Sequence, residues 1–243
     1  MRRVGLSVTA VLVLLTGGAS ASYAGSRHKL AAKCPPAYER LLSSDRQAVV
    51  YEGLESGTVT REKPGGGSEY YKAQVLGIRG CARGYARSYR LGGPLQSDGG
   101  GSAGFGGSGV RNEVLSGVVV AYEEFVRGCG SNENECSGTF IVVVRNLSTG
   151  RVVHKVPTGT LLQPTPGIVG VGQTTAIVVK NDGAVAWITE ASLAEGGYQV
   201  HALDKTGNRV LASNRDIKPY ALGLRGSELY WVEGGKRMSA VLN

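Results

Sequence analysis

The sequence is poor in features that would place this protein in several common classes. It has no C-x-x-C pair, and its three histidines, His28, His154 and His201, have no zinc-ligand spacing to any of the four cysteines. A zinc site is therefore disfavoured, and no metal is expected. Helical periodicity is nearly absent, and no uncharged run reaches the roughly 20 predominantly apolar residues of a membrane-spanning helix. These absences argue against a zinc-stabilised domain, a helical protein and a helical membrane anchor.

The N-terminus has the pattern of a secretory signal peptide. Arg2 and Arg3 precede an uncharged, mostly apolar run over residues 4–16, and the small residues 19–21 read Ala-Ser-Ala, which fits a cleavage site. We therefore predict removal of residues 1–21, a secreted or extracytoplasmic (cell envelope) location, and no transmembrane segment in the mature chain. The remaining residues, 22–243, are about 220 in number and suit a single all-β domain.

Four cysteines in an exported chain favour two disulfides, for which three connectivities exist. Cys129 and Cys136 enclose the polar hexapeptide GSNENE, so they are predicted to close a loop tip. That pairing leaves Cys34 and Cys81 for the second bridge.

The net charge of +8 falls to +6 when Arg2 and Arg3 are removed with the signal peptide. Most basic residues are scattered, but the segment IRGCARGYARSYR interleaves arginines with tyrosines, and Arg83 and Arg87 are weak candidates for binding residues. Such a segment suits RNA in the cytoplasm. Because export removes nucleic acid as a partner, the remaining expectation is an unknown envelope or extracellular ligand, a protein or a polysaccharide. The alternative is a solvated hairpin face.

Short β-branched and aromatic runs separated by glycine and Asn/Asp turns predict many short strands. A pair of strands ending in an aromatic residue occurs four times, with Tyr51, Tyr122, Trp187 and Trp231 in equivalent places, and a second hairpin follows in three of the four cases. The prediction is a propeller-like array of about four antiparallel four-stranded units, the last unit incomplete, since repeated sheets of this kind stack to bury their faces.

The segments CPPAYERLL, LSTGRVV and LYWVEGGKRMSAVL resemble motifs of a family of secreted bacterial β-propeller-like repeat proteins. The resemblance covers most of the mature chain. It implies a propeller-like fold in which residues near the N-terminus could supply the missing outer strand. Its motifs are structural and imply no activity.

No nucleotide, other cofactor or catalytic residue is expected. The segment GIVGVGQTT at residues 167–175 has the glycine spacing of a phosphate-binding loop, but Gln173 stands where the lysine is required and a strand is predicted to follow. The run at 92–109 contains glycine-rich matches to other motifs around Ser102, which follow from glycine density alone. We interpret residues 92–109 as a flexible Gly-rich connection between the first and second units.

Successive connections in an antiparallel meander alternate between the two ends of the sheet. Tight turns are predicted at one end of the sheet and long connections at the other, and rigid scaffolds commonly display binding sites on long connections. The second strands of the units should bring glutamates to this long-loop face, which makes these residues candidates for a binding site. The alternative is a carbohydrate-active enzyme of glycoside hydrolase or lyase type that uses them. The predicted long connections are residues 53–69, 92–109, 126–139 and 157–167, and the glutamates are Glu52, Glu123, Glu190 and Glu233.

Overall fold

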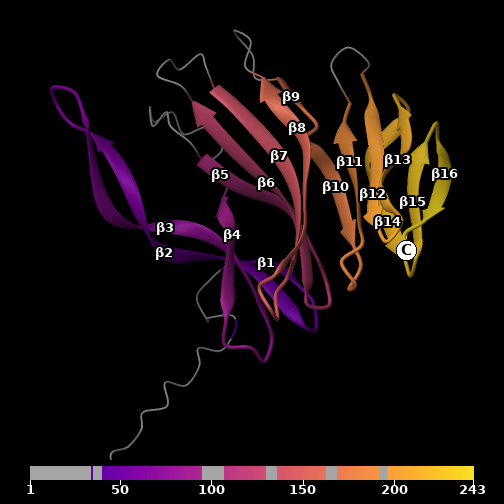
Figure 1. Ribbon diagram of the computed structural model, residues 1–243, viewed down its shortest axis with the longest axis horizontal. Helices are drawn as coiled ribbons and strands as arrows, with labels where there is room; N and C mark the ends of the chain where they lie inside the picture. Colours follow the sequence, from indigo (N-terminus) through magenta and orange to yellow (C-terminus); the bar gives the residue numbers. More distant parts are fainter. Residues whose placement is uncertain (1–33, 35–39, 95–106, 130–135, 163–168, 192–195) are drawn as a thin grey trace, which may run out of the picture. The chain divides into compact units, whose positions relative to one another are not determined.

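The computed structural model consists of strands joined by turns, with no helix in the part of the chain that it describes (Figure 1). The described residues are 34, 40–94, 107–129, 136–162, 169–191 and 196–243. Their contacts place them in one unit, residues 31–243. The all-β class that the sequence predicts is confirmed. The predicted signal peptide, residues 1–21, falls outside the described residues.

The first sheet contains nine strands, β1 to β9, in chain order (Figure 1). Its neighbours are antiparallel except for β4 and β5, which are parallel and pair only through Gly93 with Gly109 and Pro94 with Val110. The strands are Arg40–Ser44 (β1), Ala48–Glu62 (β2), Ser68–Ala82 (β3), Ser88–Pro94 (β4), Gly107–Ser116 (β5), Val119–Cys129 (β6), Cys136–Asn146 (β7), Val152–Leu162 (β8) and Val169–Val171 (β9).

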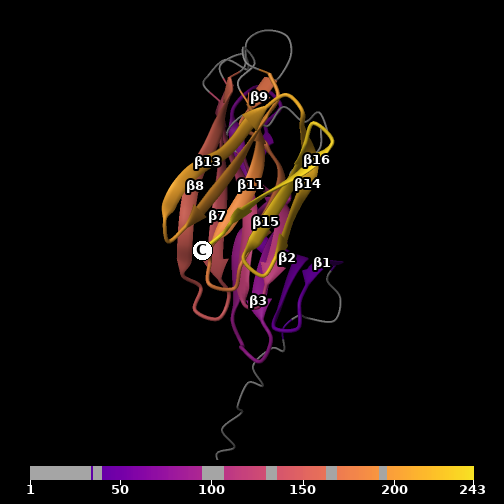
Figure 2. The ribbon, with the colours of Figure 1, turned by 90° about the vertical axis from the view of Figure 1, so that its right-hand side faces the viewer.

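Two smaller antiparallel sheets follow, one of four strands (β10 to β13) and one of three (β14 to β16), which Figure 2 turns toward the viewer. The strands are Thr174–Val179 (β10), Val185–Glu190 (β11), Tyr198–Asp204 (β12), Gly207–Asn214 (β13), Ile217–Arg225 (β14), Glu228–Glu233 (β15) and Lys236–Val241 (β16).

The antiparallel hairpins occur in the order in which the sequence predicts them. Strands β1 to β4, β5 to β8, β10 to β13 and β14 to β16 pair with their chain neighbours. The last group has three strands, as predicted. The sheets are not closed into a ring, and the first two groups are joined into one sheet by the short β4–β5 contact. A propeller arrangement is therefore not shown.

The predicted long connection at residues 53–69 is wrong. Strands β2 and β3 each contain 15 residues, and only residues 63–67 separate them. A Cβ added at Gly57 would stand only 2.5 Å from Val75, and one added at Gly77 only 2.6 Å from Glu55. The absence of a side chain at these two positions therefore leaves room for the side chains of the partner strand in this long two-stranded ribbon. A side chain of the partner strand lies over each glycine, and Gly57, which fell in the predicted connection, belongs to a paired strand.

The other predicted long connections are also shorter than expected. Strand β4 reaches Pro94 and β5 begins at Gly107, so the Gly-rich connection at 92–109 contracts to residues 95–106, which are outside the described part. Likewise β6 and β7 take up most of residues 126–139, and β8 extends through Leu162.

Apolar side chains from consecutive sheets form the core. Val119, Val142 and Val144 of the first sheet pack with Ile177 and Trp187 of the second. In the next layer Ile188 and Val200 of the second sheet pack with Trp231 of the third. The four aromatic residues that the sequence aligns are all buried: Tyr51, Tyr122, Trp187 and Trp231. These positions serve packing.

Candidate binding site

The turns that follow the first strand of each group contact one another in series. The Gly117 amide, between β5 and β6, donates a 3.1 Å hydrogen bond to the Asp45 carboxylate, between β1 and β2. A Cβ on Gly117 would also stand 3.6 Å from that of Asn181, between β10 and β11. From that turn the Lys180 amine donates a 3.3 Å bond to the Ser227 hydroxyl, between β14 and β15.

The turns that follow the third strands join the same assembly. The Arg83 amide donates to the Gln47 carbonyl at 2.7 Å, and the Leu147 amide donates to the Val118 carbonyl at 2.8 Å. We refer to this assembly of turns as the turn end. It comprises residues 45–47, 83–87, 117–118, 147–151, 180–184, 205–206 and 226–227. The tight turns thus gather as the sequence predicts.

A groove of about 610 Å³ opens at the turn end. Three strands supply its walls through their last residues and the turns that follow them. Since neighbouring residues of a strand point to opposite faces, a groove that touches three in a row runs along the edge of that strand. The lining residues are Val114, Leu115 and Ser116 of β5, Ile177, Val178 and Val179 of β10 with Lys180 and Asn181, and Leu224, Gly226 and Ser227 of the β14 hairpin.

The groove runs along the edge of β10, where Ile177 and Val179 are 5% and 7% exposed. The Lys180 amide bonds to the Ala184 carbonyl, and the β10–β11 register then alternates, so that Val178 forms a hydrogen-bonded pair with Ala186. The amide and carbonyl of Ile177 and Val179 therefore point away from β11. No ladder pairs this edge with β5 or β14 in the described chain.

Polar side chains tie the opposite end of β10 to its neighbours. Asn112, in a bulge of β5, donates to the Thr174 carbonyl at 2.8 Å. The Thr175 hydroxyl donates to the Pro219 carbonyl of β14 at 2.5 Å. The first strands of three successive groups are thus fixed together at one end of β10, and the groove lies at the other.

A buried ion pair reinforces the same junction. Glu123 of β6 is fully buried, and both its carboxylate oxygens accept 2.9 Å hydrogen bonds from Arg111 of β5. The carboxylate also accepts a 3.0 Å bond from the Thr174 amide and a bond from the Thr174 hydroxyl. Glu123 is the best-satisfied carboxylate among the four predicted glutamates, and its contacts fix β10 on the first sheet.

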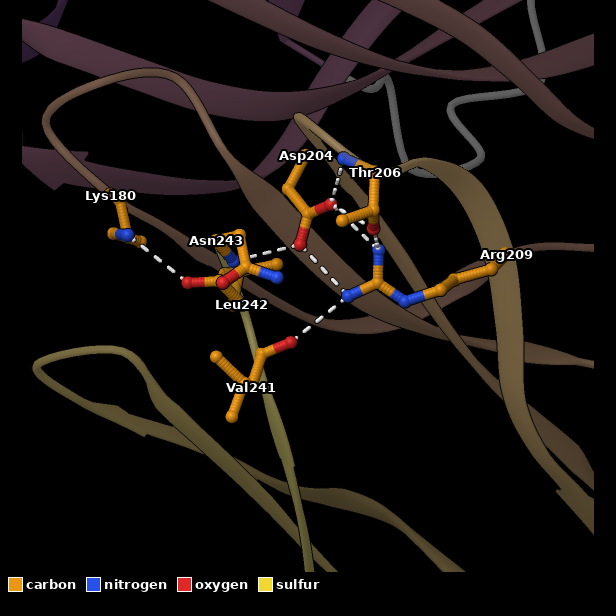
Figure 3. Close-up of polar contacts among 7 residues, drawn as sticks. All are labelled: Lys180, Asp204, Thr206, Arg209, Val241, Leu242 and Asn243. Carbon is orange, nitrogen blue, oxygen red and sulfur yellow. Dashed lines mark hydrogen bonds and ion pairs between the residues drawn. The ribbon is translucent and has the colours of Figure 1, made fainter.

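A second polar cluster closes the far side of the turn end (Figure 3). Arg209 donates two hydrogen bonds, of 2.6 and 2.8 Å, to the Asp204 carboxylate, which also accepts from the Thr206 and Asn243 amides. Lys180 reaches the Leu242 carbonyl at 3.0 Å. Residues near Leu242 are thereby held against the turns after β10 and β12. The hydrogen bonds from Arg209 lower the pKa of Asp204 far below its usual value, although burial opposes the shift.

Three of the four predicted glutamates, Glu52, Glu123 and Glu233, have separate side-chain partners. Glu52 pairs at 3.4 Å with Arg40, whose side chain is 75% exposed. Glu233 accepts from the Asn214 amide group at 2.8 Å and from the Trp231 indole at 3.3 Å. Glu190 is half-buried, and its backbone bonds to residues 172–173. In the described residues there is no group of three or more His, Cys, Asp or Glu that could hold a metal ion.

Arg83 and Arg87 lie in the turn between β3 and β4, hence at the turn end and not with the glutamates. Both are exposed. Arg83 donates to the Asp45 carbonyl at 3.3 Å and to the Ser44 hydroxyl at 3.1 Å. The two kinds of candidate residue thus come from different parts of their hairpins.

Sequence reasoning missed the groove. Its walls are apolar strand residues of the kind that fill a core, and no motif distinguishes Ile177 or Leu115 from buried neighbours. Sequence reasoning also missed Glu113, which lies in the β5 bulge and whose pKa is raised by burial and by the negative charge of Glu52. Only the path of the chain through the bulge brings these two carboxylates near each other.

The structure contains the predicted disulfide between Cys34 and Cys81, with a Cα–Cα distance of 6.2 Å. Cys81 is buried against Val49 and Tyr51. The backbone places Cys129 directly opposite Cys136 in the β6–β7 pair. The side chains of that second pair are outside the described part, so the second bridge stays a prediction.

No protein-family model matches this chain, and no significant match was found among curated proteins or solved structures. Across the described strands and turns, no helix is long and apolar enough to cross a membrane. The geometry of the turn end is therefore the basis for inferring the function.

Proposed function

We propose that this protein is an exported, non-catalytic binding protein whose ligand occupies the groove at the turn end. The observation that carries the proposal is the groove itself: its volume of about 610 Å³ falls within the roughly 300–1,000 Å³ of ligand sites, and an unpaired strand edge lines it. The predicted signal peptide supports export. The Cys34–Cys81 disulfide agrees with an oxidising compartment.

We further propose that the four groups of strands are arranged like the blades of an open propeller. The first strands β5, β10 and β14 lie beside one another, and β1 approaches β5. Innermost strands of successive blades are neighbours in this way around a propeller channel. On this interpretation the groove corresponds to one mouth of the channel, which agrees with the resemblance to propeller-like secreted proteins.

The proposal revises the location of the site within the fold. The sequence favours the long-loop face, but the groove lies among the tight turns, and Arg83 and Arg87 are there too. The enzyme alternative required two glutamates acting together. Glu123 is held by Arg111 and Thr174, and Glu233 is held by Asn214 and Trp231, so no observation favours that alternative.

The test is retention of the mature protein on cell envelopes isolated from the source organism. Asn181→Trp should fill the groove, because Asn181 is exposed and lines it. Ser239→Trp places the same side chain on exposed β16, which does not line the groove. We expect Asn181→Trp to lower retention at least tenfold and Ser239→Trp to leave it unchanged, with both melting temperatures close to wild type. Equal retention of the two variants would refute the site, and no retention of the wild-type protein would refute the function.

A further inference from the structure

The outer parts of β2 and β3 form a two-stranded ribbon that no other described strand supports. Strand β1 pairs with β2 only as far as Glu52, and β4 pairs with β3 only from Ile78 onward. In the described part of the chain, residues 53–62 and 68–77 pair only with each other (Figure 1). A two-stranded ribbon is marginally stable by itself in water, and its unpaired edges are templates for pairing with another strand.

The outer edge of β3 in this ribbon presents backbone hydrogen-bonding groups to solvent. The Arg83 amide bonds to the Gln47 carbonyl at one end of the hairpin, and the Lys63 amide bonds to the Gly67 carbonyl at the other. Because antiparallel pairs alternate, the odd-numbered residues of β3 bond to β2, and the amides and carbonyls of the even-numbered residues point away from it. These outward residues are all exposed: Tyr70, Lys72, Gln74 and Leu76.

The polar side chains along this edge turn toward β2 and away from the unpaired side. The Lys72 ammonium group donates a 3.1 Å hydrogen bond to the Thr58 hydroxyl, and the Gln74 side-chain amide donates a 3.4 Å bond to the Ser56 hydroxyl. A lysine that extends from an edge strand commonly protects it against pairing. Since the lysine of this edge is held over the neighbouring strand, the edge lacks that protection.

The apolar side chains of the edge are arranged symmetrically about Ala73. Tyr70 and Leu76, 71% and 50% exposed, lie on one face of the ribbon, three residues before and after Ala73. Tyr71 and Val75 lie on the other face, two residues before and after it. Antiparallel pairing of two copies about a twofold axis at Ala73 therefore places each Tyr70 opposite Leu76 of the other copy. The same axis places each Tyr71 opposite Val75 of the other copy.

This register also avoids contact between like charges. It places Lys72 opposite the uncharged Gln74 of the other copy, whereas an axis at position 72 would place the two Lys72 side chains opposite each other. Aromatic–aliphatic pairs across strands are stabilising, and like charges directly opposite are destabilising. Leu54, which is 65% exposed, lies beside Leu76 on the same face. The symmetric register thus extends this pair into a row of three apolar side chains, ending with Tyr70 of the other copy.

We propose that two copies of this protein form a symmetric dimer in which the β3 edges of their ribbons pair antiparallel about a twofold axis at Ala73. The two ribbons then make one four-stranded sheet in the order β2, β3, β3, β2. Four outward residues of each copy form hydrogen-bonded pairs with four of the other, which gives about eight main-chain hydrogen bonds. No residue of this interface lines the groove, so the dimer is independent of the proposed binding function.

Cross-linking at single positions tests where the axis lies. On the axis, position 73 faces itself in a non-hydrogen-bonded pair, with Cα atoms about 4.5 Å apart, a separation that a disulfide spans. We expect Ala73→Cys to form a covalent dimer when the purified mature protein is mildly oxidised, as seen by non-reducing electrophoresis. The control is Tyr71→Cys, on the same strand and face, whose two copies lie about 13 Å apart along the strands. It should form no covalent dimer.

The register is tested by charge at position 74, with the dimer dissociation constant measured by sedimentation equilibrium. Gln74→Glu brings a carboxylate opposite Lys72 of the other copy and should lower this constant at least threefold. Gln74→Lys brings a like charge to the same place and should raise it at least tenfold. The matched controls, Ser239→Glu and Ser239→Lys, place the same charges on the exposed strand β16 and should change it less than twofold.

Three results would overturn the proposal. A wild-type protein that stays monomeric at every concentration up to its solubility limit has no such dimer. A dimer that gives no cross-link through Ala73→Cys, or equal cross-linking through Tyr71→Cys, is formed by another surface or register. Equal responses to charge at positions 74 and 239 would likewise show that the β3 edge is not the interface.

Discussion

Arg111 and Glu123 form a two-point ion pair across β5 and β6, with both hydrogen bonds 2.9 Å long and the carboxylate fully buried. The same carboxylate bonds to Thr174 of β10. One buried charge thus joins two strands of the first sheet to the first strand of the second, and the position of β10 determines the groove.

Loss of Arg111 should therefore be strongly destabilising. Arg111→Met leaves the Glu123 carboxylate buried without its counter-charge, and we expect a loss of about 3–5 kcal/mol in the free energy of unfolding. The measurement is urea denaturation. The double variant Arg111→Met with Glu123→Leu should recover part of this loss, because it removes the buried charge as well. A single-variant loss below about 1 kcal/mol would show that water reaches the carboxylate.

Asn112 is the one described non-glycine residue with a positive φ, at 54°. Asn112→Gly keeps this backbone accessible but removes the hydrogen bonds to Thr174, at a cost of about 1 kcal/mol. Asn112→Val loses the same bonds and adds the strain of a β-branched residue in the left-handed region, so we expect a further loss of about 1–3 kcal/mol. Thermal and urea unfolding of both variants give the comparison. If valine is tolerated as well as glycine, the bulge does not require this backbone conformation.

Asp204 should contribute a pH-dependent part of the stability. Its folded-state pKa is lowered, chiefly by Arg209, so its contribution is present above the unfolded pKa of about 3.9 and is lost as the pH falls below that value. Asp204→Asn should cost about 3 kcal/mol at pH 7, and the difference from wild type should shrink as the pH is lowered from 4 toward 2. Urea denaturation at each pH provides the test.

The matched control for Asp204 is Asp216→Asn. Asp216 is exposed, between β13 and β14, and we expect its replacement to leave the unfolding free energy unchanged within about 0.5 kcal/mol. A difference between wild type and Asp204→Asn that stays constant down to pH 2 would contradict the ion pair with Arg209.

The disulfide between Cys34 and Cys81 spans 47 residues, and its loss should remove about 4 kcal/mol by the loop-entropy relation. The variant Cys34→Ser with Cys81→Ser tests this value, and reduction of the wild-type protein should produce a comparable loss. Thiol labelling of the denatured, unreduced protein should find no reactive cysteine. Two labelled thiols after export would show that the predicted bridge between Cys129 and Cys136 does not form.

The sequence alone determined the strands and the hairpins that join them. Alternating apolar residues place one side chain in two on the buried face, and turn residues such as those at 181–183 end each strand, so the hairpins around Tyr51, Tyr122, Trp187 and Trp231 follow from local pattern. The burial of these four aromatic side chains follows as well, because each removes a large apolar area from water when it packs between strands.

Only the tertiary structure decided where the candidate site lies. Gly57 fell in a predicted loop, but the Val75 side chain on the opposite strand covers it, and that pairing is not local in sequence. From the sequence, Glu123 is a glutamate at the end of a strand, where solvent exposure is expected. The fold instead places Arg111 and Thr174 in hydrogen-bond contact with its carboxylate. The free edge of Ile177 and Val179 depends on which strands do not pair with β10, and non-pairing leaves no mark on residue type. Local periodicity specifies which face of a strand is buried, whereas the packing of one sheet on the next decides which edge stays unpaired.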